Sequence, residues 1–227
     1  MAIKALGNTI DIHAGGSDLI FPHHTNEIAQ SESATNKTFV NYWLHGGMIN
    51  VEKDKMAKSK GNFLKLKDIS SPLAYRYWLL TAHYRTQVNF TFEAVSASQT
   101  ALIKLCNYFL SLGNETGKID ENYNNKFIDF INDDLDMPKA IALAWELIKD
   151  KKVSDSDKKA TLLKFDEVFG LKLNELKISD EEIPEEIKFL IEERENARKA
   201  KDFKKSDALR AEIESRGYEI KDTKIIL

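Results

Sequence analysis

The lysine-rich segment VEKDKMAKSKGNF, residues 51–63, is the stretch whose composition points most directly to chemistry. Residues 53–67 contain six lysines and one acidic residue, although the formal net charge of the whole chain is −3. Ammonium groups gathered in this way can neutralise the charge that develops on a polyphosphate leaving group, and Gly61 would let such a loop close. A solvated surface turn explains the composition equally well, so the lysines alone leave both interpretations open.

The motif PHHTNE, residues 22–27, offers candidate metal ligands. His23 and Glu27 are four residues apart and His24 and Glu27 three apart, so either pair would share one face of a helix. An imidazole nitrogen and a carboxylate oxygen are both ligands for zinc. Two ligands do not complete a site, and the single cysteine, Cys106, lies in an apolar helical pattern typical of a core position. From the residues alone, a surface hydrogen bond between histidine and glutamate is the favoured interpretation.

A third candidate is the glycine-rich motif HAGGSD, residues 13–18, which follows a short strand predicted over Thr9–His13. Gly15 and Gly16 would allow a ligand to approach the backbone, and Asp18 could accept hydrogen bonds from the hydroxyl groups of a sugar. A tight turn with a capping aspartate is the simpler interpretation.

Cations and aromatic rings alternate in AYRYW and HYR, where Tyr75, Arg76, Tyr84 and Arg85 fall at helical spacing. Such a face can bind a nucleic-acid backbone, although ordinary helix packing with arginine at the rim is at least as common. A second basic segment, residues 188–205, contains seven basic and four acidic residues. Local basic patches can bind polyanions even in a chain with little net charge.

The elements that must position these residues change in character along the chain. The first 60 residues have an α/β pattern, with a helix starting at Pro22 and strand material around 39–52 that is broken at Gly46–Gly47. Most of the remainder is helical. The patterns predict a helix after Ser70–Ser71–Pro72, a helix over 93–112 and two helical runs between 126 and 150. They also predict a helix ended by Gly170, one from Pro184 to about Lys201, and a last helix before Gly217.

Length and composition limit the class of protein. The 227 residues can bury a sizeable core and suit two or more domains. One cysteine excludes a disulfide framework and suits a reducing cytosol, and no apolar stretch reaches the roughly 18 residues of a membrane span. The start, MAIKALGNTI, is neither a signal peptide nor a transit sequence. We therefore expect a cytoplasmic protein with no membrane partner.

Taken in order, the motifs resemble one family. DIHAGGSDLIFPHHTNEIAQSES and NYWLHGGMINVEKDKMAKSKGNF are similar to the second half of the catalytic domain of cysteinyl-tRNA synthetase, a class I aminoacyl-tRNA synthetase. KMAKS, Lys55–Ser59, matches the KMSKS signature of that class with Ala57 in place of the central serine. INDDLDMPKAIAL and ARKAKDFKKSDALRAEIESRGYEIKDT also resemble the family, so the likeness extends over essentially the whole chain.

The resemblance implies a fold of α/β plus mainly α class. It implies the C-terminal part of a Rossmann-type catalytic domain, then a helical bundle and a small α+β anticodon-binding domain. The expected divisions are 1–65 with the KMSKS-like loop, 66–115 as a helical stem-contact or connecting region, 116–178 as a bundle of the DALR type, and 179–227 as the anticodon-binding domain.

The resemblance also implies roles for single residues in a cysteine–tRNA ligase, which converts ATP, L-cysteine and tRNA(Cys) to cysteinyl-tRNA(Cys), AMP and diphosphate. Lys55 and Lys58 are expected to be catalytic on the phosphates of ATP, which enters with Mg2+. The rest of the ATP site would comprise Gly15, Gly16, Asp18 and Ser59. His13 matches a residue near the cysteine substrate.

His23 and Glu27 match two of four ligands of a zinc ion that binds the substrate thiolate, which favours His23 over His24. Zinc prefers a soft sulfur ligand, so such a site would select cysteine over serine by bond type. At the other end of the chain, Arg198, Asp207 and Asp222 match positions that contact anticodon bases. The closing TKIIL departs from the usual Gly-and-Trp ending of the family.

Two features of the family do not occur in this sequence: the HIGH motif, and the two cysteines that would complete the zinc site. We therefore expect a C-terminal portion of the enzyme, with the N-terminal half as its missing partner, weak zinc binding at best and no adenylate formation by the chain alone. One alternative is a stand-alone tRNA-binding module. Another is a ligase that couples cysteine to an amino sugar, which the extended C-terminal region with Arg198 and Asp207 disfavours.

Overall fold

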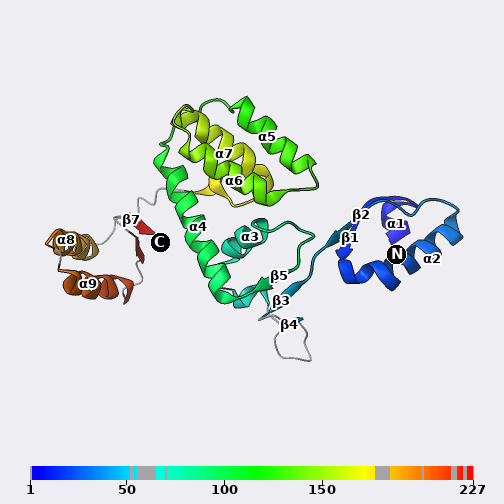
Figure 1. Cartoon of the computed structure of the whole chain (residues 1–227), viewed down its shortest axis with the longest axis horizontal. Coiled ribbons are helices and arrows are strands. Elements are labelled where there is room, and N and C mark those ends of the chain that lie inside the picture. The colour runs from blue at the N-terminus through cyan, green and yellow to red at the C-terminus, as the bar shows by residue number, and fades with distance from the viewer. Residues whose placement is uncertain are drawn as a thin grey trace. The chain divides into compact units, whose positions relative to one another are not determined.

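The computed structural model divides into two compact units, Met1–Lys177 and Ile178–Leu227, which are described separately (Figure 1). The residues that the structure describes are 2–51, 54–55, 65–69, 71–176, 185–200, 202–215, 219–221 and 224–226.

The first unit begins with a short helix, α1 (Ala2–Leu6), and a two-stranded parallel sheet. Strand β1 (Ile10–Gly16) pairs with β2 (Val40–Gly46), and helix α2 (Thr25–Thr35) lies between them in the chain. The pairing runs from Ile10 opposite Val40 to Gly16 opposite Gly46. The sequence predicted that the strand would end at His13 and that Gly15 and Gly16 would form a turn. That expectation was wrong, because both glycines pair with β2 as its last two partners.

A second, three-stranded sheet follows in the order β4-β3-β5, with β3 (Ile49–Val51), β4 (Asp54–Lys55) and β5 (Val88–Phe90). The break between β2 and β3 covers Gly47 and Met48, one residue later than the predicted break at Gly46–Gly47. Helix α3 (Pro72–Leu80) begins where predicted, after Ser71, whose hydroxyl oxygen accepts a hydrogen bond from the Ala74 amide at 3.3 Å. The side chains that pack this sheet against its helices are Val51, Ile69, Ala74, Trp78, Phe90 and Val95.

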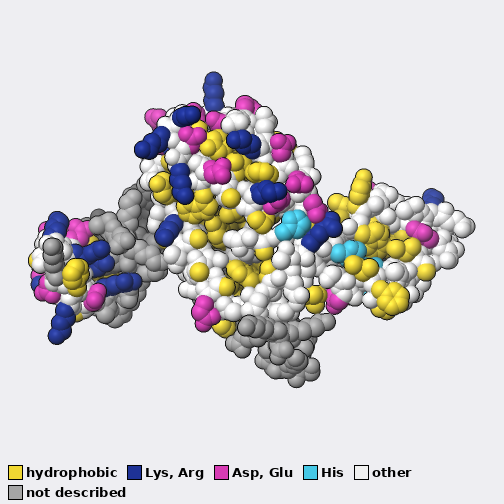
Figure 2. Space-filling model, in the orientation of Figure 1, with side chains coloured by type: hydrophobic (Ala, Val, Ile, Leu, Met, Phe, Trp, Pro, Cys, Tyr) yellow, Lys and Arg dark blue, Asp and Glu magenta, His cyan; other side chains and the backbone are white. Residues whose placement is uncertain are grey.

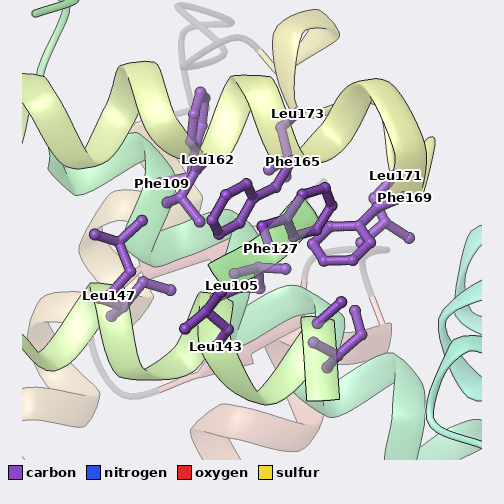
Figure 3. Close-up of a cluster of buried hydrophobic side chains, with 14 of the residues drawn as sticks. Leu105, Phe109, Phe127, Leu143, Leu147, Leu162, Phe165, Phe169, Leu171 and Leu173 are labelled. Carbon is purple, nitrogen blue, oxygen red and sulfur yellow. The ribbon is translucent and has the colours of Figure 1, made fainter. Parts of the chain in front are cut away.

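The remaining helices of the first unit share one larger core, shown in Figure 3. They are α4 (Phe92–Ser111), α5 (Glu121–Asn132), α6 (Met137–Lys149) and α7 (Asp155–Phe169). Phe127 and Phe165 stack with ring centroids 4.1 Å apart, and Phe169 meets Phe127 edge-on at 5.4 Å. Helix α3 joins this core through Tyr77, whose hydroxyl accepts a hydrogen bond from the Trp145 indole at 2.9 Å. The helix predicted over 93–112 and the helix predicted to end at Gly170 stop close to those positions, at Ser111 and Phe169.

Arg76 and Asp166 hold the end of α7. The Arg76 guanidinium, from α3, donates to the carbonyl oxygens of Phe169 and Val168, which lie at the negative end of the helix. Of the two interpretations open for Arg76, the structure therefore supports helix packing. Asp166 is buried, and its two carboxylate oxygens each accept a backbone hydrogen bond at 2.7 Å, from Leu171 and Leu173. These two bonds fix the chain as it leaves the helix.

Replacing Asp166 with alanine is expected to lower the free energy of unfolding by about 2–3 kcal/mol, because two buried amide groups would lose their charged acceptor. Urea unfolding of both proteins measures the difference. Asp155→Ala is the control, because Asp155 is an exposed residue of the same helix whose one ion pair among the described residues is a 3.4 Å contact with Lys158. Equal losses in the two variants would contradict the role of Asp166.

The second unit consists of two helices and a hairpin. Helices α8 (Glu185–Lys199) and α9 (Phe203–Ser215) pack together, and β6 (Glu219–Lys221) pairs antiparallel with β7 (Lys224–Ile226). Side chains buried in this unit include Arg194, Ala197, Ser206, Leu209 and Ile213. Over the part of the chain that the structure describes, in either unit, no helix is both long and apolar enough to cross a membrane.

Candidate metal and substrate site

Four histidines and one glutamate converge on one face of the β1–β2 sheet. His13 comes from β1, His45 from β2, and His23, His24 and Glu27 from the turn and helix between the strands. The Glu27 carboxylate is 3.5 Å from His13 Nε2 through Oε2 and 3.5 Å from His23 Nε2 through Oε1. The crossover from β1 to β2 thus brings residues 13 and 27 together.

The Glu27 carboxylate has the features of a metal ligand. One ligand atom from each of His13, His24 and Glu27 lies within 4.8 Å of the others. Two atoms bound to a tetrahedral zinc at about 2.0–2.1 Å lie roughly 3.3–3.4 Å apart. The two 3.5 Å contacts of Glu27 are close to that separation. Its Oε2 atom is buried and has no hydrogen-bond partner among the described residues, which is costly for a carboxylate and is relieved when the oxygen binds a cation.

Stacked rings fix the histidines in place. Trp43 lies 4.8 Å from the His13 ring and 4.8 Å from the His24 ring, and its plane is within 1° of that of His45. His24 is almost fully buried, and its Nδ1 is 2.8 Å from His45 Nε2. Burial first, and then the neighbouring His13 and His45, lower the pKa of His24. A neutral imidazole keeps the lone pair that a metal requires.

Gly15 has a specific reason to lack a side chain. A Cβ atom at this position would lie 2.6 Å from Cε1 and 2.9 Å from Nε2 of His24, so any larger residue would displace the buried ring. Gly16 lies beside the carboxylate of Asp18, an exposed side chain that can rotate away from a Cβ atom. The requirement for glycine is therefore specific to Gly15, which makes room for the buried His24 ring.

The structure brings together some of the predicted site residues and leaves others undescribed. His13, His23 and Glu27 meet in one cluster, with Gly15 against it. Lys55 lies in β4 opposite Asn50, and Arg198 and Asp207 are exposed on α8 and α9. The side chain of Lys55 and the whole of Lys58, Ser59 and Asp222 lie outside the described residues.

Sequence reasoning missed Trp43 and His45. It considered His24 as a metal ligand with Glu27, but the resemblance then favoured His23. The available signal was the alternation in NYWLHGG, which places Trp43 and His45 on the same face of a strand. Cys106 is partly buried, and burial raises its pKa to about 11, so it is a neutral thiol that packs against the core.

Comparison with known families matches both ends of the chain. Residues 1–100 match the family described as "tRNA synthetases class I (C) catalytic domain". Residues 180–224 match the "Cysteinyl-tRNA ligase anticodon binding domain".

Curated relatives match over almost the full chain. "Cysteine--tRNA ligase 1" of Burkholderia lata is 38% identical over 98% of this chain and 48% of its own length. "Cysteine--tRNA ligase" of Finegoldia magna is 40% identical over 99% of this chain and 52% of its own length. The corresponding protein of Caldicellulosiruptor saccharolyticus is 39% identical over 98% of this chain and 53% of its own length. The chain thus spans about half the length of the curated relatives it matches.

Among solved structures, the fold is similar to that of agnB2 LeuRS of Agrobacterium radiobacter K84, determined in a ternary complex with tRNA and LeuAMS. The TM-score is 0.55 at 15% identity, over 72% of this chain and 26% of that one. At this identity the likeness concerns the fold alone.

Proposed function

This chain belongs to the cysteinyl-tRNA synthetase family of class I aminoacyl-tRNA synthetases, and we propose that it forms part of a cysteine–tRNA ligase. The reaction joins L-cysteine to tRNA(Cys) with conversion of ATP to AMP and diphosphate. The observation that carries the proposal is the histidine cluster around Glu27. The chain that contains it is similar over nearly all its length to proteins named cysteine–tRNA ligase. Rossmann-type organisation of the first part of the chain belongs to the same proposal.

The histidine–glutamate cluster is proposed to select the amino acid. Glu27 and His23 would hold a zinc ion, and His13 and His24 lie within reach of the same carboxylate. A bound zinc would supply a soft Lewis acid that prefers a thiolate over a hydroxyl group. His13, stacked on Trp43, would line the position of the cysteine substrate. The stacked rings would exclude water from one side of the substrate and fix its orientation.

The end of β1 is proposed to hold the adenosine of ATP. Gly15 and Gly16 are the last two residues of that strand, and the exposed Asp18 carboxylate, which follows them, suits the hydroxyl groups of a ribose. Lys55, Lys58 and Ser59 would bind the phosphates of ATP, and Mg2+ would be the counter-ion of those phosphates. In the second unit, Arg198, Asp207 and Asp222 would recognise anticodon bases, since guanidinium and carboxylate groups match the exposed edges of unstacked bases.

The β1–β2 sheet supports the proposal that the rest of the ligase packs against this chain. Parallel sheets are normally covered on both faces, but Ile12 and Tyr42, which face each other across the two strands, are 64% and 72% exposed. Figure 2 shows hydrophobic side chains on the surface of the part that contains β1, β2 and α2. We therefore propose the remaining half of the enzyme as the partner of this face.

Mixing this chain with the remaining half of a relative tests the proposed function. The mixture is expected to catalyse cysteine-dependent exchange between ATP and pyrophosphate and to charge tRNA(Cys), whereas each part alone forms no adenylate. The exchange assay measures the first step and acid-stable charging measures the second. A mixture that associates and yet stays inactive would contradict the ligase. Preferential tRNA(Cys) binding by this chain alone, with no activity in the mixture, would favour the stand-alone module.

A further inference from the structure

Asp134, in the turn between α5 and α6, binds three consecutive side chains of the loop before β5. Its Oδ1 accepts hydrogen bonds from the Tyr84 hydroxyl at 2.8 Å and from Arg85 Nη2 at 3.0 Å. Its Oδ2 lies 2.8 Å from Arg85 Nε and 3.7 Å from His83 Nε2. The arginine therefore chelates the carboxylate with two nitrogens, which fixes direction as well as distance. The hydrogen bonds from Tyr84 and then Arg85 lower the pKa of Asp134, so the carboxylate is ionised.

The backbone beside Asp134 is strained, and the ion pair between Asp134 and Arg85 stabilises the fold too little to account for that strain. Asp134 and Leu135 have φ values of 54° and 58°, in the left-handed region that aspartate tolerates but leucine avoids, so the strain lies at Leu135. The Asp134 and Arg85 side chains are 43% and 63% exposed, and exposed ion pairs contribute little to stability. Strain of this kind persists where geometry has a function.

The loop that Asp134 holds is attached to the backbone between the two sheets. Gly47 donates its amide hydrogen to the Tyr84 carbonyl at 2.7 Å, and Val88 donates to the Met48 carbonyl at 3.0 Å. A Cβ atom on Gly47 would collide with the Thr86 carbonyl and lie 2.9 Å from the Arg85 carbonyl oxygen. The loop and the segment around Gly47 therefore touch backbone to backbone, with no side chain between them to absorb movement.

That segment joins the two proposed reaction sites. Its first residue, His45, is 2.8 Å from the buried His24 of the histidine cluster. It ends with β3, which pairs with β5 from Ile49 opposite Val88 to Val51 opposite Phe90. In the sequence, the lysine-rich residues follow β3 directly. A displacement of the loop that Asp134 holds would shift residues 45–51 and change the separation of the two sites.

We propose that Asp134 is a positioning residue of the ligase, which fixes the segment 45–51 through Arg85 and Tyr84 and thereby sets the histidine cluster relative to the strand β3. This role rests on the proposed function. Asp134 contacts neither ATP nor cysteine in this scheme, and its effect passes through the backbone contact at Gly47.

Amide hydrogen exchange in the 227-residue chain tests the mechanical part without any activity. Asp134→Asn keeps one acceptor oxygen and tolerates the left-handed backbone, but it loses the ionic chelation by Arg85. Exchange at Gly47 and Val88 is expected to become about tenfold faster, a 1.4 kcal/mol change in opening free energy by the tenfold conversion. Asp133→Asn is the matched control, because Asp133 contacts only Lys139 Nζ, at 3.6 Å, among the ion pairs described. Equal exchange in both variants would overturn the proposal.

Arg85→Gln provides a second variant, which removes the chelating group from the other side. It is expected to accelerate the same two amides, and the double variant with Asp134→Asn should add little more because both remove one interaction. Fully additive effects would show that the two residues act separately and would overturn the proposal.

Activity of the chain mixed with the remaining half of the enzyme tests the functional part. Asp134→Asn is expected to lower kcat for adenylate formation at least about tenfold, since small displacements of reacting groups are costly, with less than about a twofold change in the Kd for tRNA(Cys). Faster exchange with unchanged kcat would reduce Asp134 to a structural residue and overturn its positioning role. A wild-type mixture that associates and yet stays inactive would instead contradict the proposed function, and the exchange data would then decide the mechanical coupling independently.

Discussion

Glu27→Gln is expected to lower the affinity for zinc of this chain, mixed with the remaining half of the enzyme, by at least about 100-fold. Even residues that only support metal ligands typically change affinity 10- to 100-fold when they are replaced, and Glu27 is proposed as a direct ligand. Both of its carboxylate oxygens contact a histidine of the cluster, one at 3.5 Å from His13 and the other at 3.5 Å from His23. An amide of the same shape keeps the packing but replaces one oxygen with a donor that repels the cation. Competition with a chromophoric chelator measures the dissociation constants.

The control for this substitution is Glu93→Gln, which makes the same chemical change at an exposed residue in the first turn of α4. Its zinc affinity should equal that of the wild type. His23→Gln and His24→Gln then separate the two possible ligand sets. The proposed assignment expects the larger loss from His23→Gln. Unchanged affinity in Glu27→Gln would remove zinc from this cluster altogether.

Local signals predicted most of the helices. Ser71, Thr91 and Ser154 each cap the helix that follows with a side-chain hydrogen bond, and Gly170 ends α7 in the left-handed conformation. These effects act within a few residues and are therefore readable from the sequence. The pairing of His23 with Glu27 was predictable for the same reason, because four residues bring two side chains to one helical face.

Contacts between distant segments were not predictable from local pattern. His24 meets His45 because two strands 24 or more residues apart pair in one parallel register, and a shift of one residue would place His45 on the other face. The same register extends β1 over Gly15 and Gly16, where the sequence alone favoured a turn. The hydrogen bonds and ion pair that join Tyr84 and Arg85 to Asp134 likewise depend on how the helices pack. The local pattern of cations and aromatic rings around Tyr84 and Arg85 therefore did not predict this contact.

Lys58→Ala is expected to lower the rate of adenylate formation by about 100- to 1000-fold in the chain mixed with the remaining half of the enzyme. That range is typical for removal of one group that stabilises charge developing in a transition state, and the proposed role of Lys58 is to neutralise the leaving diphosphate. Cysteine-dependent exchange between ATP and pyrophosphate measures the rate. Affinity for tRNA(Cys) should stay nearly unchanged, because the proposed anticodon contacts lie in the second unit.

Lys67→Ala is the matched control, because it removes the same charge from an exposed position after the lysine-rich segment. A general electrostatic effect of the six lysines would lower the rate similarly in both variants, and added salt would reduce it in both. A contact specific to Lys58 lowers the rate in one variant only and resists moderate salt. Equal loss of exchange activity and tRNA affinity in Lys58→Ala would contradict a phosphate contact, since a residue that acts on the leaving group has no reason to weaken binding of the acceptor.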